Sequence, residues 1–174
     1  SYKGPIDKFI PDEYKSELAD IAGLVPQDTI FFIADKEERA NLYAGQLRNE
    51  IGKRLDLYEK NAFRFCFVND FPMFEYDNEE KKIVFTHNPF SMPQGGLEAL
   101  NTKNPLDILA YQYDIVCNGI ELSSGAVRNH DLDIMVKAFE IAGYTEEDLK
   151  TKFGALYNAF QFGAPPHAGM APGV

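Results

Sequence analysis

The spacing of hydrophobic residues changes character near residue 60. Ahead of that point, a helix ending near residue 56 is predicted by apolar residues that recur every three or four positions: Ala40, Ala44, Leu47, Ile51 and Leu55. Asp35, with Glu38 three residues later, has the spacing of a capping box at its start. A short helix is predicted over 12–22, and the apolar run 29–34 is typical of a buried strand. We interpret residues 1–60 as one α+β unit.

After residue 60 the helical spacing of apolar residues is replaced by a strand-like pattern, in which every second residue is apolar. Three phenylalanines alternate in 63–68, which places them on one face of a strand. Residues 91–103, with Pro93 and two glycines, indicate a mobile loop. The other predicted elements are strands over 71–76 and 83–86, a helix over 131–142 and a helix from Thr145 onward. An α+β fold follows, with an antiparallel sheet and flanking helices in a second domain, 61–174.

Asn118-Gly119 lies between two extended runs and is the strongest short signal for a β-hairpin. A two-residue turn pairs Asp114 with Ser123 across the two strands. Asp114 and Glu121 then share one face as diagonal neighbours, within roughly 7–8 Å at the backbone. The opposite face is predicted to join the core and carries Tyr113, Ile115, Cys117, Ile120 and Leu122.

The hairpin concentrates the candidate chemistry of the chain. Two neighbouring carboxylates repel each other unless a cation lies between them. Mg²⁺ bound to a nucleotide phosphate would be such a cation. Two solvated carboxylates on an exposed face explain Asp114 and Glu121 equally well. The small-residue run Ser123-Ser124-Gly125 allows a bulge or a close backbone approach to a ligand, and a bulge could turn Arg128 onto the ligand face. Arg128 could then aim its planar fork at a carboxylate, or it could be a surface arginine. His87, at the end of a strand, is either structural or part of a site.

Composition narrows the classes of function. The formal net charge of −10 excludes a bulk, non-specific nucleic-acid binder, which needs Lys and Arg to replace counterions. The two cysteines lie in apolar runs and are expected to be buried thiols rather than a disulfide. The three histidines lack metal-ligand spacing, so zinc is not expected. Because no signal peptide or membrane-length apolar run is found, we expect a cytoplasmic protein without a membrane partner.

Four segments together resemble bacterial-type aspartyl-tRNA synthetases, which are class II enzymes. Each is similar to a family motif: 71–75 to "DFPLFE", 87–93 to "HHPFTxP", 113–128 to "YDLVLNGxELGGGSxR" and 163–169 to "GAPPHGG". They occur in the family's order with sensible gaps, so the resemblance covers essentially the whole chain. Residues 1–60 are similar to the second half of the family's inserted GAD-type domain, and residues 61–174 to part of its catalytic core.

The resemblance implies ATP-dependent activation of L-aspartate to aspartyl-adenylate, followed by transfer of the aspartyl group to tRNA. It implies ATP as a substrate, Mg²⁺, and a homodimeric parent enzyme. Residue by residue, Arg128 would bind the side-chain carboxylate of aspartate, His87 would lie on the loop that closes over it, and Glu121 with Asp114 would hold ATP through magnesium. Gly173 and Val174 would begin the ATP-contacting "GLDR" segment. No residue of the chain is assigned as a catalytic acid, base or nucleophile.

The chain also departs from the family pattern. Asn88 stands where a second histidine is usual, and Ser123-Ser124 replaces two glycines. The last motif is interrupted at Val174, and the anticodon-binding domain and the motif with the phosphate-gripping arginine are absent, so we expect this piece alone to be inactive. Two alternatives stay open: a tRNA-binding module of a GAD-containing amidotransferase, and a paralogue without activity. Whether the parent also charges tRNA-Asn is not decided by these residues.

Overall fold

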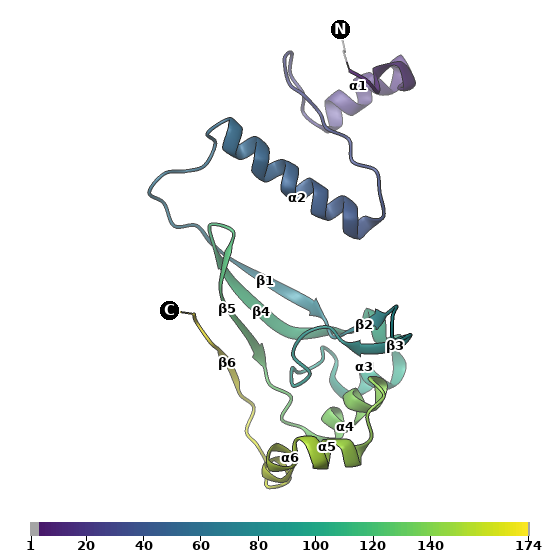
Figure 1. Cartoon of the computed structure of the whole chain (residues 1–174), viewed down its shortest axis with the longest axis vertical. Coiled ribbons are helices and arrows are strands. Elements are labelled where there is room, and N and C mark those ends of the chain that lie inside the picture. Colours follow the sequence, from purple (N-terminus) through teal and green to yellow (C-terminus); the bar gives the residue numbers. More distant parts are fainter. Residues whose placement is uncertain (1–3, 174) are drawn as a thin grey trace. The chain divides into compact units, whose positions relative to one another are not determined.

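The computed structural model describes residues 4–173, which form two compact units divided at Lys60 and Asn61 (Figure 1). The first unit contains the 3-10 turn η1 (Asp7–Phe9) and the helices α1 (Asp12–Ile21) and α2 (Glu37–Arg54). Both helices were predicted: α2 from its apolar period, and α1 from its place between Pro11 and Gly23. No helix within 4–173 is long and apolar enough to cross a membrane.

Two predictions for the first unit are wrong. The run 29–34 belongs to no strand, and its side chains from Ile30 to Ile33 are 37–56% exposed. Within the described chain it has no partner strand, and an apolar sequence without a partner does not form a sheet. The capping box at Asp35 is also absent, because the Asp35 carboxylate instead accepts a hydrogen bond from the Lys36 backbone N–H (2.7 Å) and pairs with Arg39 (2.6 Å).

The second unit is built on a four-stranded antiparallel sheet in the order β1-β4-β5-β6. Its strands are β1 (Phe65–Pro72), β4 (Leu109–Cys117), β5 (Ile120–Val127) and β6 (Ala168–Met170). A separate hairpin joins β2 (Phe74–Asp77) to β3 (Lys82–Phe85). The helical elements are α3 (Gly96–Thr102), η2 (Pro105–Asp107), α4 (Leu132–Ile141), α5 (Glu146–Lys152) and α6 (Gly154–Gln161). This is the predicted α+β fold.

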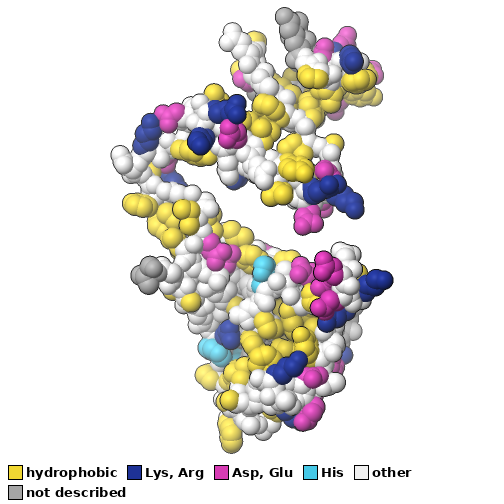
Figure 2. Space-filling view, in the orientation of Figure 1, with side chains coloured by type: hydrophobic (Ala, Val, Ile, Leu, Met, Phe, Trp, Pro, Cys, Tyr) yellow, Lys and Arg dark blue, Asp and Glu magenta, His cyan; other side chains and the backbone are white. Residues whose placement is uncertain are grey.

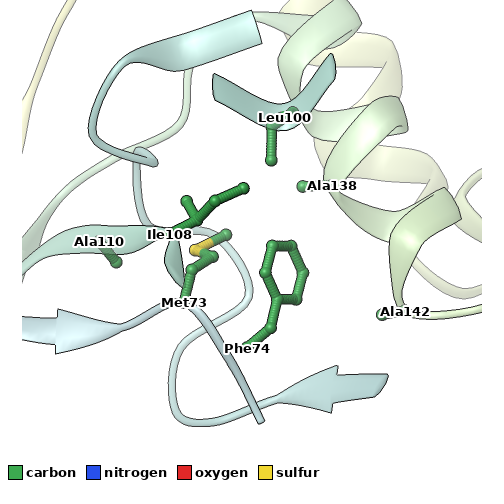
Figure 3. Packing of buried hydrophobic residues seen from close by; sticks show 7 residues of the cluster. All are labelled: Met73, Phe74, Leu100, Ile108, Ala110, Ala138 and Ala142. Carbon is green, nitrogen blue, oxygen red and sulfur yellow. The ribbon is translucent and has the colours of Figure 1, made fainter. Parts of the chain in front are cut away.

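The core of this unit lies between the small hairpin and the helices. One cluster of buried residues surrounds Phe74 and is shown in Figure 3: Met73, Phe74, Leu100, Ile108, Ala110, Ala138 and Ala142. A second cluster joins α4 to the two following helices: Met135, Phe139, Leu149 and Tyr157. Leu100 belongs to α3, so the predicted mobile loop over 91–103 is wrong: its glycines start a helix instead.

The helix starts of this core follow the sequence closely. The Asp131 carboxylate caps α4 by accepting hydrogen bonds from the backbone N–H groups of Asp133 (2.9 Å) and Ile134 (3.2 Å). Thr145 and Asp148 form a reciprocal capping box at the start of α5. The helix predicted from Thr145 is interrupted at Phe153, where α6 begins. Local capping chemistry therefore fixes where the core helices begin.

Hydrophobic side chains also reach the surface of the molecule (Figure 2). Along β1 the phenylalanines alternate as predicted, but Phe65 is 61% and Phe67 is 63% exposed. Both cysteines are free; Cys117 is buried as predicted, whereas Cys66 on β1 is exposed. β1 is an edge strand, and no described part of this unit covers it, so its apolar composition does not bury it.

The hairpin turns at Asn118-Gly119 as predicted, with positive φ angles of 51° and 81° that suit a type I′ turn. Val116 pairs with Glu121, but Asp114 pairs with Ser124 rather than with Ser123. Leu122 is therefore an extra residue on β5, a β-bulge.

The bulge corrects the predicted core face. Ser123, only 3% exposed, takes the place opposite Ile115, whereas Ile120 is 67% and Leu122 is 40% exposed. The predicted register is correct up to Glu121 and wrong beyond it, because strict alternation ends at the extra residue.

Gly125 on β5 is a position where a side chain cannot fit. A Cβ there would lie 2.4 Å from the Tyr113 ring and 2.5 Å from the Gly169 carbonyl oxygen. The Tyr113 hydroxyl crosses this gap and donates a hydrogen bond to that carbonyl (3.0 Å), which holds β6 against the sheet. Ser123 and Ser124 carry side chains in the same run, so of these three positions only Gly125 requires glycine.

We expect Gly125→Ala to lower the free energy of unfolding by about 1–3 kcal/mol, because Tyr113 or β6 must shift. Gly169→Ala is the matched control, since nothing lies within 4 Å of its Cβ position. It is expected to change that free energy by at most about 0.5 kcal/mol. Urea unfolding of both variants measures this, and equal stability for the two would refute the close approach at Gly125.

Candidate active site

The bulge at Leu122 brings the candidate residues to one face of the sheet. Asp114 lies opposite Ser124 and two residues from Val116, which in turn lies opposite Glu121. Asp114 and Glu121 thus share a face, as predicted. Because the bulge shifts the alternation by one residue, Ser124 and Arg128 also belong to that face; strict pairing would have turned Arg128 away.

This face carries a cavity of about 620 Å³. The residues that line it come from β1, β4, β5 and β6, from residues directly flanking β5 and β6, and from the segment that follows β3. They are Phe71, His87, Asn88, Gln112, Asp114, Glu121, Ser124, Gly125, Ala126, Arg128, His167, Ala168, Gly169, Met170 and Ala171. Four residues predicted from the sequence, His87, Asp114, Glu121 and Arg128, therefore lie around one cavity although up to 41 positions separate them.

Arg128 is the cationic side chain of this cavity. It is half-buried, and its guanidinium carbon lies 5.7 Å from the centre of the Phe90 ring. Its backbone N–H donates to the His167 carbonyl (2.9 Å), which ties the end of β5 to the strand that follows. Within residues 4–173 no carboxylate pairs with the guanidinium, so its planar fork is available to a ligand carboxylate.

His87 lies at the edge of the cavity and is exposed. Its ring meets Phe71 of β1 edge-on, with 5.2 Å between the ring centres. The segment that follows is joined to the end of β5: the Met92 N–H donates to the Val127 carbonyl and the Asn129 N–H donates to the Phe90 carbonyl, both at 2.8 Å. The histidine therefore begins a loop whose far end is fixed beside Arg128.

The two carboxylates differ in exposure, because Asp114 is half-buried and Glu121 is exposed. Neither forms an ion pair with a described Lys or Arg. The described residues contain no group of three or more His, Cys, Asp and Glu that could hold a metal by itself. Two carboxylates nevertheless fit Mg²⁺, which is commonly held by one or two carboxylates together with water and substrate phosphates.

Comparison with known proteins decides the family. The family model described as "tRNA synthetases class II (D, K and N)" matches residues 10–174. The chain belongs to this family. The resemblance drawn from the four motifs is thereby confirmed.

Curated relatives agree with this placement. An Aspartate--tRNA(Asp/Asn) ligase of Ehrlichia chaffeensis is 62% identical over 174 residues, which is all of this chain and 30% of that protein. One of Zymomonas mobilis is 60% identical over 171 residues, 98% of this chain and 29% of that protein. A solved aspartyl tRNA synthetase from Entamoeba histolytica aligns with a TM-score of 0.43 at 21% identity, over 92% of this chain and 26% of that one. The chain thus spans about 30% of the length of the relatives it matches.

The segment after β6 runs along β5. The Ala171 N–H donates to the Ser124 carbonyl (3.2 Å) and the Gly173 N–H donates to the Leu122 carbonyl (3.0 Å). Ala171 lines the cavity, whereas Gly173 is exposed and does not. Val174 lies outside the described residues. The structure thus brings Gly173 beside the bulge but not into the cavity.

Gln112 and His167 are among the cavity residues that received no role from the sequence. Gln112 is 8% exposed and lies two residues before Asp114, so the alternation that selected Asp114 could also have selected it. His167 lines the cavity, and its Nδ1 lies 2.8 Å from the Pro165 carbonyl oxygen. His167 lies in the motif 163–169, but the motif does not show that pairing of β6 with β5 brings this residue near Arg128.

Proposed function

We propose that the whole protein is an aspartate–tRNA ligase and that aspartate and ATP meet in the cavity of the second unit. In the first step a carboxylate oxygen of aspartate attacks the α-phosphorus of ATP, and pyrophosphate leaves. In the second step a hydroxyl at the tRNA 3′ end attacks the aspartyl carbonyl, and AMP leaves. The observation that carries this proposal is the single face on which Arg128, paired with no carboxylate of residues 4–173, accompanies two carboxylates.

Arg128 is assigned to the side-chain carboxylate of aspartate. A guanidinium donates two parallel hydrogen bonds to a carboxylate, whereas an amide presents N–H groups that it cannot accept. Its half-buried position beside Phe90 strengthens such a pair relative to bulk water. His87, at the edge of the cavity, is assigned to the loop that covers the amino acid.

Asp114 and Glu121 are assigned to ATP through Mg²⁺. Bound there, the ion would neutralise charge on the phosphates during transfer. The two carboxylates would fix its place, and Ser124 between them and Arg128 leaves room for a ligand. Catalysis then consists of positioning and charge stabilisation, and it requires no acid, base or nucleophile from this chain.

The remaining assignments rest on the family resemblance. Gly173 and Val174 would begin a segment that contacts ATP, and residues 1–60 would form the C-terminal part of a GAD-type inserted domain. The parent enzyme would be a cytoplasmic homodimer that binds tRNA. The relatives at 58–62% identity are named for both tRNA(Asp) and tRNA(Asn), which supports extending the proposal to both tRNAs.

A tRNA-binding module of an amidotransferase is the alternative. The first unit alone fits either protein, but the cavity and all four of its predicted residues belong to the second unit. The family match also extends through residue 174. These observations favour the ligase.

Aspartate-dependent exchange of pyrophosphate into ATP by the whole protein tests the proposal. We expect turnover with aspartate and none with asparagine at the same concentration, because only aspartate completes the pair with Arg128. A folded preparation that exchanges pyrophosphate with neither amino acid would contradict the proposal and favour a paralogue or a binding module.

A further inference from the structure

A buried amide on the floor of the cavity holds the loop that starts at His87. Gln112 on β4 is 8% exposed, and its Nε2 donates a hydrogen bond to the Asn88 backbone carbonyl (3.2 Å). The bond joins residues 24 positions apart. It is a contact between the sheet and the loop on the His87 side, whereas the backbone bonds of Phe90 and Met92 secure the other side.

Asn88 is shaped to receive this bond. Its side-chain Oδ1 accepts a hydrogen bond from the Phe90 N–H (2.9 Å), an Asx turn that sets the direction of the following residues. Its carbonyl also accepts from the Ser91 N–H (3.2 Å), and one carbonyl oxygen has lone pairs for two donors. The Asn88 side chain therefore forms its hydrogen bond within the loop, and the Asn88 backbone carbonyl accepts the bond from Gln112.

We propose that Gln112 is a positioning residue for amino-acid binding, acting on His87 through the Asn88 carbonyl. The inference rests on the proposed function of this cavity and deepens it. It also gives asparagine a role where the family motif has a second histidine, because the Asn88 side chain forms the Asx turn while its backbone carbonyl accepts the bond from Gln112. Without the bond, His87 is held at this end by its edge contact with Phe71.

A test variant should remove the N–H donor of Gln112 and keep the size of its side chain. Methionine matches glutamine in length and nearly in volume but has no N–H to donate, so Gln112→Met removes the bond and keeps the packing. Gln94 provides a matched control. Its Nε2 also donates to a carboxylate and a carbonyl, those of Asp70 (2.6 Å) and Ala110 (3.5 Å), but it does not line the cavity.

The experiment compares the whole protein with its Gln112→Met and Gln94→Met variants in aspartate-dependent pyrophosphate exchange. We expect Gln112→Met to raise KM for aspartate about fivefold, the change that one neutral hydrogen bond gives, with kcat and KM for ATP within about twofold. Gln94→Met is expected to leave all three constants unchanged.

Hydrogen exchange provides a readout that does not depend on activity. In Gln112→Met the amides of Phe90 and Ser91 are expected to exchange about fivefold faster, while those of Met92 and Asn129 stay protected by their bonds to β5 and Phe90.

An unchanged KM for aspartate, or unchanged exchange at Phe90 and Ser91, overturns the role of Gln112. A lower melting temperature together with a raised KM for both aspartate and ATP also overturns it, because the residue is then structural. Absence of activity in the unmodified protein overturns the proposed function and the link to aspartate with it. Hydrogen exchange then still decides whether Gln112 holds the loop.

Discussion

Replacing Arg128 with leucine in the whole protein is expected to lower kcat/KM for aspartate by about two to three and a half orders of magnitude. Removing one partner of a desolvated ion pair leaves the other charge unpaired, at a cost of about 3–5 kcal/mol. Each factor of ten in rate corresponds to about 1.4 kcal/mol. The loss should appear as a raised KM for aspartate, measured by pyrophosphate exchange, with KM for ATP nearly unchanged.

Stability provides the first control for this variant. Leucine keeps an apolar contact with Phe90, and the backbone bond from position 128 to His167 does not depend on the side chain. The melting temperature should therefore stay close to that of the unmodified protein. Arg54→Leu is a second control, since Arg54 is exposed on α2 and forms a surface ion pair with Glu50 (2.7 Å). Normal aspartate kinetics in Arg128→Leu, or its unfolding, would make Arg128 a structural residue.

Replacing Glu121 with glutamine is expected to lower kcat/KM for ATP by about ten- to a hundredfold, since a contact to a charged group contributes about 1.5–3 kcal/mol. The variant should also need a higher Mg²⁺ concentration for half-maximal exchange, because an amide is a weaker ligand than a carboxylate. Glu121 is exposed, so stability should not change.

Glu140→Gln is the matched control for this variant. Glu140 lies on α4, outside the cavity, and forms a long surface ion pair with Lys137 (3.5 Å). It should retain normal ATP and Mg²⁺ dependence. If Glu121→Gln weakens aspartate use more than ATP use, the assignment of the two carboxylates to the nucleotide is wrong.

The elements that the sequence predicts well are those set by local chemistry. Asn118-Gly119 specifies its own turn because both residues tolerate positive φ. Asp131 and the Thr145–Asp148 pair specify helix starts because their side chains bond to nearby backbone N–H groups. The turn and both helix caps each form within about four consecutive residues, so their structure does not depend on the rest of the fold.

The bulge at Leu122 shows where this local reasoning stops. Leu122 continues the alternation of β5 in the sequence, and the small residues Ser123-Ser124-Gly125 beside it allow a bulge without fixing its position. The position of the bulge depends on the pairing of β5 with β4 on one side and on the close approach of Gly125 to β6 on the other. Those contacts are tertiary, so the sequence indicated that a bulge could turn Arg128 onto the face of Asp114 and Glu121, but not where the extra residue lies.

Local composition misled in two other places, one apolar and one rich in proline and glycine. The run 29–34 has strand-like residues but no partner within the described chain, and the glycine-containing stretch 91–103 packs Leu100 into the core. Gly95 and Gly96 both have positive φ and form the start of α3, a use of glycine that resembles a loop in sequence. Burial depends on which elements meet, and a single stretch of sequence does not contain that information.

The most direct test is a crystal structure of the whole protein with a non-hydrolysable aspartyl-adenylate analogue. We predict that both oxygens of the aspartyl side chain lie within about 3 Å of the Arg128 guanidinium nitrogens, in a bidentate pair. The phosphate is predicted on the side of Asp114 and Glu121, and His87 above the amino acid. An analogue bound elsewhere, or bound here with its side-chain carboxylate away from Arg128, would contradict the assignment of this cavity.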